Sequence, residues 1–212
     1  MKRASIFESF RVAGWGVLHT LATQRHMKIH TCAGVMVMLV GMALPLGLGP
    51  KIALLFSVAL VFFAEILNTA LEHFVDIHIR EFHRGAMLAK DAAAAGVLVL
   101  SVFTVIVLAD ILWVERALVQ RSGPVIARSL IFGLPLTFTV AALLWGPTQW
   151  WVRAPLALGA AVFALPLWLE SVDPIFSVVL GGLILMAAVA RPRPNPSDGA
   201  LSPELPDSSG AE

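Results

Sequence analysis

The sequence has one cysteine and few charged residues, and both shortages exclude classes of protein. The single cysteine, Cys32, excludes an internal disulfide and a metal cluster built from cysteines. Charged residues make up 14% of the 212 residues and apolar residues 58%. Soluble domains usually have about a quarter charged residues and below about half apolar ones. The composition therefore predicts an integral membrane protein rather than a soluble domain.

The N-terminal segment also lacks a feature, an uninterrupted apolar stretch. It has basic residues without such a stretch, so we expect no cleaved signal peptide. Apolar residues recur there every three or four positions, at Ile6, Phe10, Ala13, Val17 and Leu21. This spacing predicts an amphipathic helix that lies on the membrane surface.

Long apolar runs predict an all-α membrane bundle in which six spans follow the surface helix. A helix needs roughly 20 apolar residues to cross a bilayer core of about 30 Å. The runs lie at 29–48, 52–75, 86–112, 129–146, 153–169 and 174–190. The last three are weaker and contain Pro135, Pro155 and Pro166, so a re-entrant hairpin is an alternative to full spans there.

Composition divides the chain into four parts. A first membrane domain at 1–115 is followed by a polar linker at 116–128, further apolar spans at 129–190 and a tail at 191–212. The tail is rich in proline, serine and acidic residues, which predicts disorder. In the six-span arrangement, 11 of the 15 lysines and arginines fall on the side of the N-terminus. The positive-inside rule then predicts a multi-pass membrane protein with a cytoplasmic N-terminus.

The second span carries polar residues that hydrocarbon disfavours. At about 100° per residue, Glu65, Glu72 and Asp76 fall within about 20° of one line, with Asn68 beside them. Ionisable residues inside a span usually mark a functional path. Asn68 alone is equally explained as a polar contact between helices, but like charges in a row are not needed for packing. A divalent cation, or a phosphate that carries one, would relieve their repulsion.

The third span begins with Lys90 and Asp91, before a run of alanines. Small residues allow helices to approach closely, so we expect Lys90 to reach the acidic stripe and bind phosphate. The alternative is a lysine that extends to the lipid headgroups.

The stretch "EILNTALEHFVDIHIREFHRGAMLAKDAAAAGVLV" resembles the signature of the small prokaryotic membrane lipid kinases, the diacylglycerol kinase and undecaprenol kinase family. The pattern is E-[IL]-L-N-[ST]-A-[IL]-E-x(3)-D, then E-[YF]-H, then A-K-D before small residues. The upstream stretches "SFRVAGWG" and "RHMKIH" are also similar to the family. The resemblance covers roughly residues 5–115 and leaves the later spans without a counterpart. The family uses neither a Walker motif nor a kinase glycine-rich loop, and this sequence has neither.

The resemblance implies a homotrimer of three-span subunits with active sites at the membrane surface between subunits. ATP and Mg²⁺ arrive from the cytoplasm and the lipid alcohol, diacylglycerol or undecaprenol, arrives from the bilayer. Glu65 matches the general base that takes the proton of the hydroxyl group, and Glu72 matches a Mg²⁺ ligand beside the triphosphate. The other matched residues form the ATP-binding stretch and shape the site: Glu81, Phe82, His83, Lys90 and Asp91 for ATP, and Asn68 and Asp76 for shape. We expect no nucleic-acid partner.

Gln24 is the main departure from this pattern. It occupies the position of a second metal-binding glutamate in the family, and His26 follows where asparagine is common. A glutamine offers Mg²⁺ a carbonyl oxygen but no charge, so we expect weaker metal binding. Two hypotheses follow. The first is a lipid kinase that depends on ATP and Mg²⁺, and the second is a weak or inactive relative that binds nucleotide or cation as a membrane interaction protein.

Overall fold

The computed structural model describes residues 5–79, 81–171 and 173–191 of the chain, and these form an all-α bundle. The described helices are α1 (Ile6–Thr23), α2 (Arg25–Ala43), α3 (Leu48–His78), α4 (Arg84–Val114), α5 (Arg116–Arg121), α6 (Gly123–Trp145), α7 (Trp150–Leu169) and α8 (Pro174–Val189). This confirms the predicted fold class. The tail predicted to be disordered lies outside the described residues except for Arg191.

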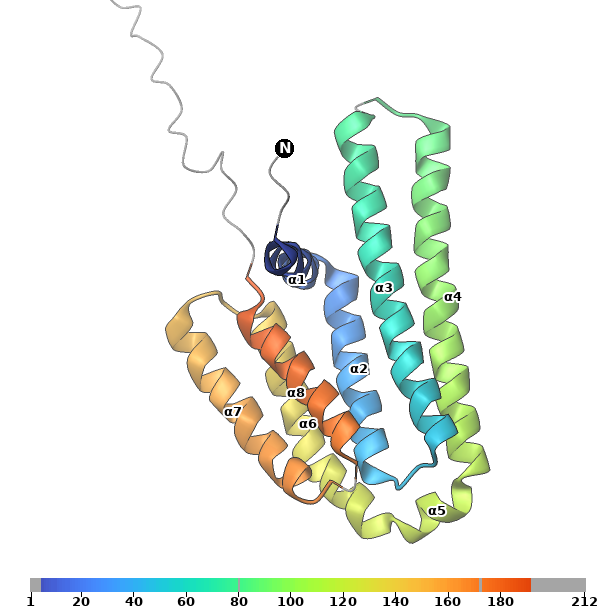
Figure 1. Cartoon of the computed structure of the whole chain (residues 1–212), viewed down its shortest axis with the longest axis vertical. Helices are drawn as coiled ribbons and strands as arrows, with labels where there is room; N and C mark the ends of the chain where they lie inside the picture. The colour runs from blue at the N-terminus through green and yellow to red at the C-terminus, as the bar shows by residue number, and fades with distance from the viewer. Residues whose placement is uncertain (1–4, 80, 172, 192–212) are drawn as a thin grey trace, which may run out of the picture.

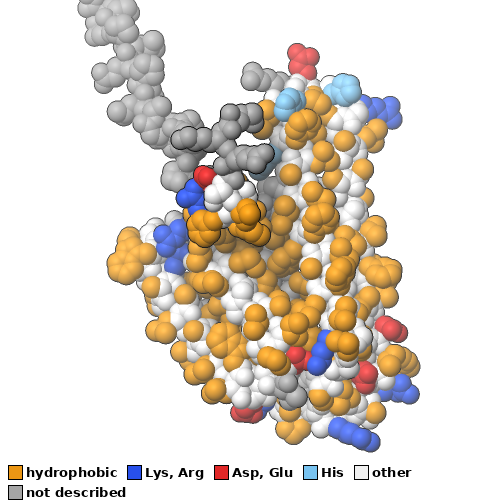
Figure 2. Space-filling view, viewed as in Figure 1, with side chains coloured by type: hydrophobic (Ala, Val, Ile, Leu, Met, Phe, Trp, Pro, Cys, Tyr) orange, Lys and Arg blue, Asp and Glu red, His pale blue; other side chains and the backbone are white. Residues whose placement is uncertain are grey.

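The spans are those that the apolar runs predict, with one difference in length. In the described part of the chain, α2, α3, α4, α6 and α7 are long and apolar enough to cross a membrane. Helix α8 is apolar but has 16 residues, below the roughly 20 that a full crossing needs. Figure 2 shows apolar side chains over the sides of the bundle and charged and histidine side chains near its two ends. The protein is therefore a multi-pass membrane protein.

Helix α1 lies across one end of the bundle, and α3 and α4 extend beyond it (Figure 1). Residues Ile6, Phe7 and Phe10 of α1 are exposed, whereas Leu21, near the end of this helix, is buried. The α3–α4 pair is antiparallel, and each of its helices has 31 residues. An apolar face of α1 toward lipid is consistent with the predicted surface helix. The connected ends of α3 and α4 then stand on the same side of the membrane as α1.

Helices α6 and α8 pack on the side of α2 away from α4, so α2 lies between the first membrane domain and the later helices (Figure 1). The close approach depends on glycine. A Cβ atom at Gly41 would lie 2.6 Å from the ring of Phe176, and one at Gly133 would lie 2.7 Å from Leu39. Small residues at such crossings allow the tight packing that stabilises helices in lipid.

Arg153 joins the ends of α6 and α8. Its side chain is 4% exposed, and its guanidinium donates to the carbonyl oxygens of Leu143 at 2.7 Å and Ala187 at 2.7 Å. It also donates to Ala188 at 3.1 Å and Ala190 at 2.9 Å. The last carbonyls of a helix have no partner within the helix, so one arginine satisfies several of them here.

The opposite end of the bundle is held by ion pairs. Lys51 of α3 pairs with Asp173, which also caps α8 by accepting from the backbone N–H of Ile175. Arg128 of α6 pairs with Glu170. The stretch predicted as a linker, 116–128, is helical in the structure, because α5 and the first turns of α6 occupy most of it. The later helices are thus tied to the first membrane domain at this end.

Candidate active site

The polar residues of α3 form a stripe whose exposure rises toward the connected ends of α3 and α4. Glu65 is 2% exposed and Asn68 is 5% exposed, Glu72 is part-buried, and the side chain of Asp76 is 62% exposed. The spacing of these residues on a helix predicts this shared face, and their burial gives it a direction. One end of the stripe is dry and the other end meets water.

The dry end of the stripe has oxygen atoms without partners. Asn68 Nδ2 donates to Glu72 Oε1 at 3.1 Å, and the hydroxyl of Thr69 donates to the backbone oxygen of Glu65 at 2.9 Å. Among the described residues, Glu65 Oε2 and Asn68 Oδ1 are buried and have no hydrogen-bond partner. Buried polar atoms are nearly always paired, so these two acceptors are available to a ligand. Carboxylate and amide oxygens are ligands that divalent cations prefer.

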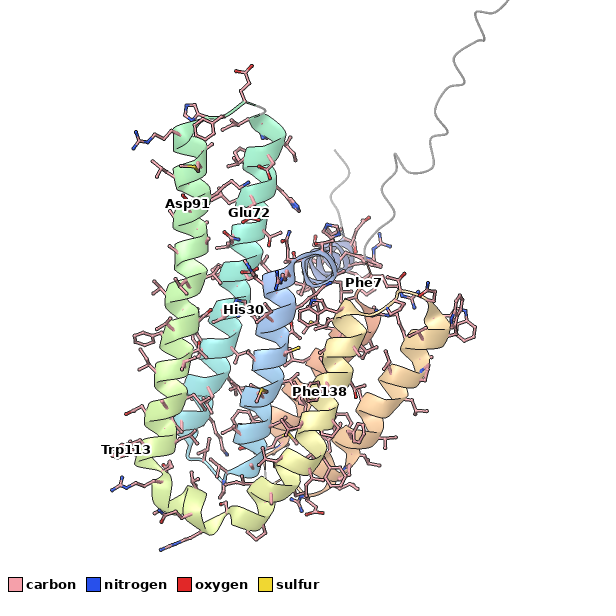
Figure 3. All side chains as sticks on the ribbon, turned by 180° about the vertical axis from the view of Figure 1, so that it is seen from behind. Phe7, His30, Glu72, Asp91, Trp113 and Phe138 are labelled. Atoms are coloured by element: carbon pink, nitrogen blue, oxygen red, sulfur yellow. The ribbon has the colours of Figure 1, made fainter. Side chains whose placement is uncertain are left out.

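Lys90 of α4 reaches the stripe at its exposed end. Its Nζ lies 2.8 Å from Asp76 Oδ1, and the charge of Glu72 also acts on it. This confirms the predicted contact between Lys90 and the acidic stripe, with Asp76 as the partner that makes the ion pair. Figure 3 shows Glu72 and Asp91 near the connected ends of the two helices. The pairing leaves an ammonium group beside two carboxylates at the membrane surface.

The α3–α4 connection forms a small hollow of about 270 Å³ above this ion pair. Its lining includes the residues predicted to lie along a nucleotide: Glu81, Phe82, His83, Lys90 and Asp91. Phe82 is 85% exposed at the rim. His83 has a structural role that the sequence pattern did not indicate, because its Nδ1 accepts from the backbone N–H of Ala86 at 3.3 Å and caps α4. The cap fixes the direction in which the connection enters the helix.

Gln24 is on neither α3 nor α4, and its side chain makes no hydrogen bond to the described residues of the stripe. It is the residue between α1 and α2, and its backbone N–H donates to Thr20 at 2.8 Å. Within the described residues, no hydrogen bond links its side chain to Glu72, and no three side chains of His, Cys, Asp or Glu converge as a metal site. The structure therefore brings together the α3 and α4 residues of the predicted site, and the metal-binding role of Gln24 stays a prediction.

Histidines of α1, α2 and α3 make contacts between helices that the spacing within one helix does not predict. His26 of α2 is close enough to Glu65 to interact with its charge. The rings of His19 of α1 and His73 of α3 lie 6.4 Å apart. Their only signal in the sequence is the position of His26 beside the expected metal ligand. Packing of α1 and α2 against α3 is what places them here.

Comparison with known proteins agrees with this geometry. The sequence profile described as prokaryotic diacylglycerol kinase matches residues 11–112. An undecaprenol kinase of Bacillus subtilis is 36% identical over 101 residues, which are 48% of this chain and 82% of that protein. The chain belongs to the prokaryotic diacylglycerol kinase family.

A second relative of this family is a diacylglycerol kinase of Synechocystis. It is 40% identical over 104 residues, which are 49% of this chain and 59% of that protein. The match thus spans less than two thirds of the length of the Synechocystis protein. No solved structure matches the chain. The family match ends near the end of α4, so it includes the whole stripe and the hollow and excludes α5 to α8.

Proposed function

We propose that this member of the prokaryotic diacylglycerol kinase family transfers the γ-phosphoryl group of ATP to the hydroxyl group of a membrane lipid alcohol. The names of its relatives offer diacylglycerol and undecaprenol as candidates. The observation that carries the proposal is that the polar stripe of α3 runs from a buried end at Glu65 to an exposed end at Asp76. An unpaired, buried carboxylate at Glu65 lies on the same face of α3 as the exposed Asp76–Lys90 pair.

This arrangement suits a reaction between a substrate in the bilayer and one in water. Glu65 accepts the proton of the lipid hydroxyl as the hydroxyl oxygen forms its bond to the γ-phosphorus. The bond from that phosphorus to the bridging oxygen breaks, and ADP leaves with the electron pair. Phosphoryl transfer needs positioning and neutralisation of charge more than covalent help from the protein. A positioned base adds about 10²- to 10⁴-fold.

The other site residues act on the nucleotide. Lys90 neutralises phosphate charge near Glu72, and Glu81, Phe82 and His83 lie along the nucleotide in the hollow. Asp91 lines the same hollow, while Asn68 and Asp76 hold Glu72 and Lys90 in place through their hydrogen bonds.

Mg²⁺ is the cofactor that this donor set fits. The carboxylate of Glu72 and the unpaired amide oxygen of Asn68 beside it are hard oxygen donors of the kind that Mg²⁺ prefers. Mg²⁺ usually takes one or two carboxylates and completes its coordination with substrate phosphates and water. Glu72 would hold the ion, with Gln24 as a second, uncharged ligand. Bound with ATP, it would neutralise charge on the transferring phosphoryl group.

The proposal also includes the assembly of the protein and its orientation in the membrane. We propose a homotrimer with sites between subunits, the assembly that the resemblance to the family implies. The site faces the cytoplasm of a bacterial inner membrane, together with the N-terminus. Support for this orientation is the excess of lysine and arginine on that side of the bundle.

A phosphate-transfer assay in mixed micelles tests the proposal, with diacylglycerol and undecaprenol offered in parallel. We expect the wild type to label one of them and Glu65→Gln to lower kcat by at least about 100-fold, since it removes the base. Asp110→Asn is the matched control. It makes the same acid-to-amide change on an exposed residue of α4, remote from the site in sequence, and should keep wild-type turnover. Near-normal turnover of Glu65→Gln would overturn the assignment of the base.

A second candidate function is nucleotide or cation binding without transfer. Gln24 favours it, because this residue lacks the charge of a metal-binding glutamate and makes no hydrogen bond to Glu72. This function requires that the wild type transfers no phosphate to either lipid while a titration calorimeter still detects binding of ATP with Mg²⁺. Turnover on either lipid excludes it.

A further inference from the structure

An apolar groove of about 330 Å³ continues the stripe of α3 away from the membrane surface. Its α3 wall is made by Val58, Val61 and Phe62. At about 100° per residue, all three lie within about 60° of Glu65, which is one turn nearer the site than Val61. The groove therefore begins about 5 Å along the helix from the carboxylate that we propose as the base.

Helices α4 and α2 form the other two walls of the groove. Helix α4 contributes Ser101, Thr104 and Leu108, on the face that also carries Lys90. The hydroxyls of Ser101 and Thr104 are satisfied by donating to backbone oxygens of their own helix, each at 2.8 Å. Helix α2 contributes His30 at the end near the site (Figure 3) and apolar residues beyond it. The interior of the groove thus offers little to a polar ligand.

A second apolar cavity of about 260 Å³ extends the groove and is built in part by helices outside the family match. The two cavities share Met36 and Val40 of α2. The wall of the second cavity that lies farthest from the site is formed by Val119 of α5 and by residues of α6. Ser129 is the smallest of these α6 residues. Figure 1 shows that α5 passes beneath this end, between α4 and α6.

The groove and the second cavity together follow a long stretch of α2. From His30 to Ala43 their lining spans 13 residue steps of α2, or about 20 Å at 1.5 Å per residue. A single leaflet is about 15 Å deep, half of the roughly 30 Å core. The length and the apolar lining suit a hydrocarbon chain that continues from the site.

We propose that this groove holds a hydrocarbon chain of the lipid alcohol, and that α5 and α6 form its far wall and so select substrates by chain length. The inference rests on the proposed function, because the head of the chain lies at Glu65. It adds a role for the helices that the family match does not include. A chain longer than one leaflet reaches Ser129, and a short chain ends before it.

Photocrosslinking tests the groove directly. The full-length wild type in micelles is illuminated with a long-chain lipid alcohol that carries a diazirine near the end of its chain, and labelled residues are mapped by mass spectrometry. We expect labels within 126–137. Ser129→Trp should abolish them, and Ser129→Leu should reduce them. Ala127→Trp, an exposed change on the opposite face of α6, should keep them. Absence of labels in the wild type overturns the proposal.

Enzyme kinetics then distinguish a loss of selection for lipid chain length from a general loss of activity. Ser129→Trp should raise the KM for a long-chain alcohol at least tenfold and leave the KM values for a short-chain alcohol and for ATP unchanged. An equal loss for both alcohols, together with a changed oligomeric mass, would overturn the proposal in favour of a subunit contact. Labels at 126–137 in a wild type that transfers no phosphate would support the groove and reject the proposed lipid kinase.

Discussion

Buried charged groups have different roles in the two regions of this protein, the family region at 11–112 and the later helices α5 to α8. In the region outside the family match, the buried Arg153 directs four hydrogen bonds to helix ends, and the buried Asp173 pairs with Lys51. In the family region, the buried carboxylate of Glu65 makes no side-chain hydrogen bond among the described residues. A buried charge that is bound to groups of other helices holds these helices together, whereas one without such a partner costs stability and is kept for a ligand.

The long helices also differ in how much of their surface other helices cover. Helix α2 is the most buried of the long helices, because it lies between α3 on one side and α6 and α8 on the other. Helix α4 is exposed over most of its length. The later helices thus reinforce one side of the first membrane domain and leave the α3–α4 pair, with its site, open to lipid and water.

The largest expected effect separates activity from stability at Glu65. Replacing an unpaired buried carboxylate with a neutral amide removes a desolvation cost, so Glu65→Gln should keep or raise the Tm while turnover falls. Differential scanning fluorimetry in detergent checks the Tm on the sample that is assayed. A clear fall in Tm would show that Glu65 is a structural residue and would remove the contrast with Arg153.

Arg153→Met should give the reverse result. It leaves several helix-end carbonyls without a donor in an apolar setting and should lower the free energy of unfolding by about 3 kcal/mol. Thermal unfolding in detergent measures the loss. At a temperature where the variant stays folded, its KM for ATP should match the wild type, because Arg153 does not line the α3–α4 hollow. An unchanged Tm would reject the role of Arg153 as a connection between helix ends.

Lys90→Met should raise the KM for ATP by about tenfold, since it removes a cation beside the proposed phosphates. Lys51→Met is the matched control, because it removes the same charge at the opposite end of the bundle. The control should lower the Tm and leave the KM for ATP unchanged. Equal effects of both changes on the KM would show that Lys90 does not act locally on the nucleotide.

Gln24→Glu should have the smallest effect, a few-fold decrease in the Mg²⁺ concentration that gives half-maximal turnover. A carboxylate adds charge to the ligand set, and charge count tunes the affinity of oxygen sites for divalent cations. Gln120→Glu on the exposed face of α5 is the control and should not change the Mg²⁺ requirement. No decrease for Gln24→Glu would place this residue outside the metal site.

Much of the site was predictable from the sequence because helical periodicity is local. The spacing of Glu65, Glu72 and Asp76 predicts their common face without knowledge of any neighbour. That Lys90 reaches this face was also expected. Its choice of Asp76 was not, since that depends on how far α4 is shifted along α3.

Arg153 shows where such prediction ends. In the sequence it is a lone arginine two and three positions after Trp151 and Trp150, and nothing in that pattern indicates its partners. Its partners lie 10 to 37 positions away in the sequence, at the ends of two other helices. The capping role of His83 was missed for a related reason, because a cap depends on the backbone direction of the preceding loop.

The sequence by itself determined the membrane setting, the family and the single polar face on α3. These depend on composition, on motif and on the repeat of one helix. The tertiary structure decided which buried oxygens remain without partners, how the stripe continues into an apolar groove, and that α6 and α8 cover α2. Those features arise from contacts between helices distant in sequence, and no local pattern specifies them.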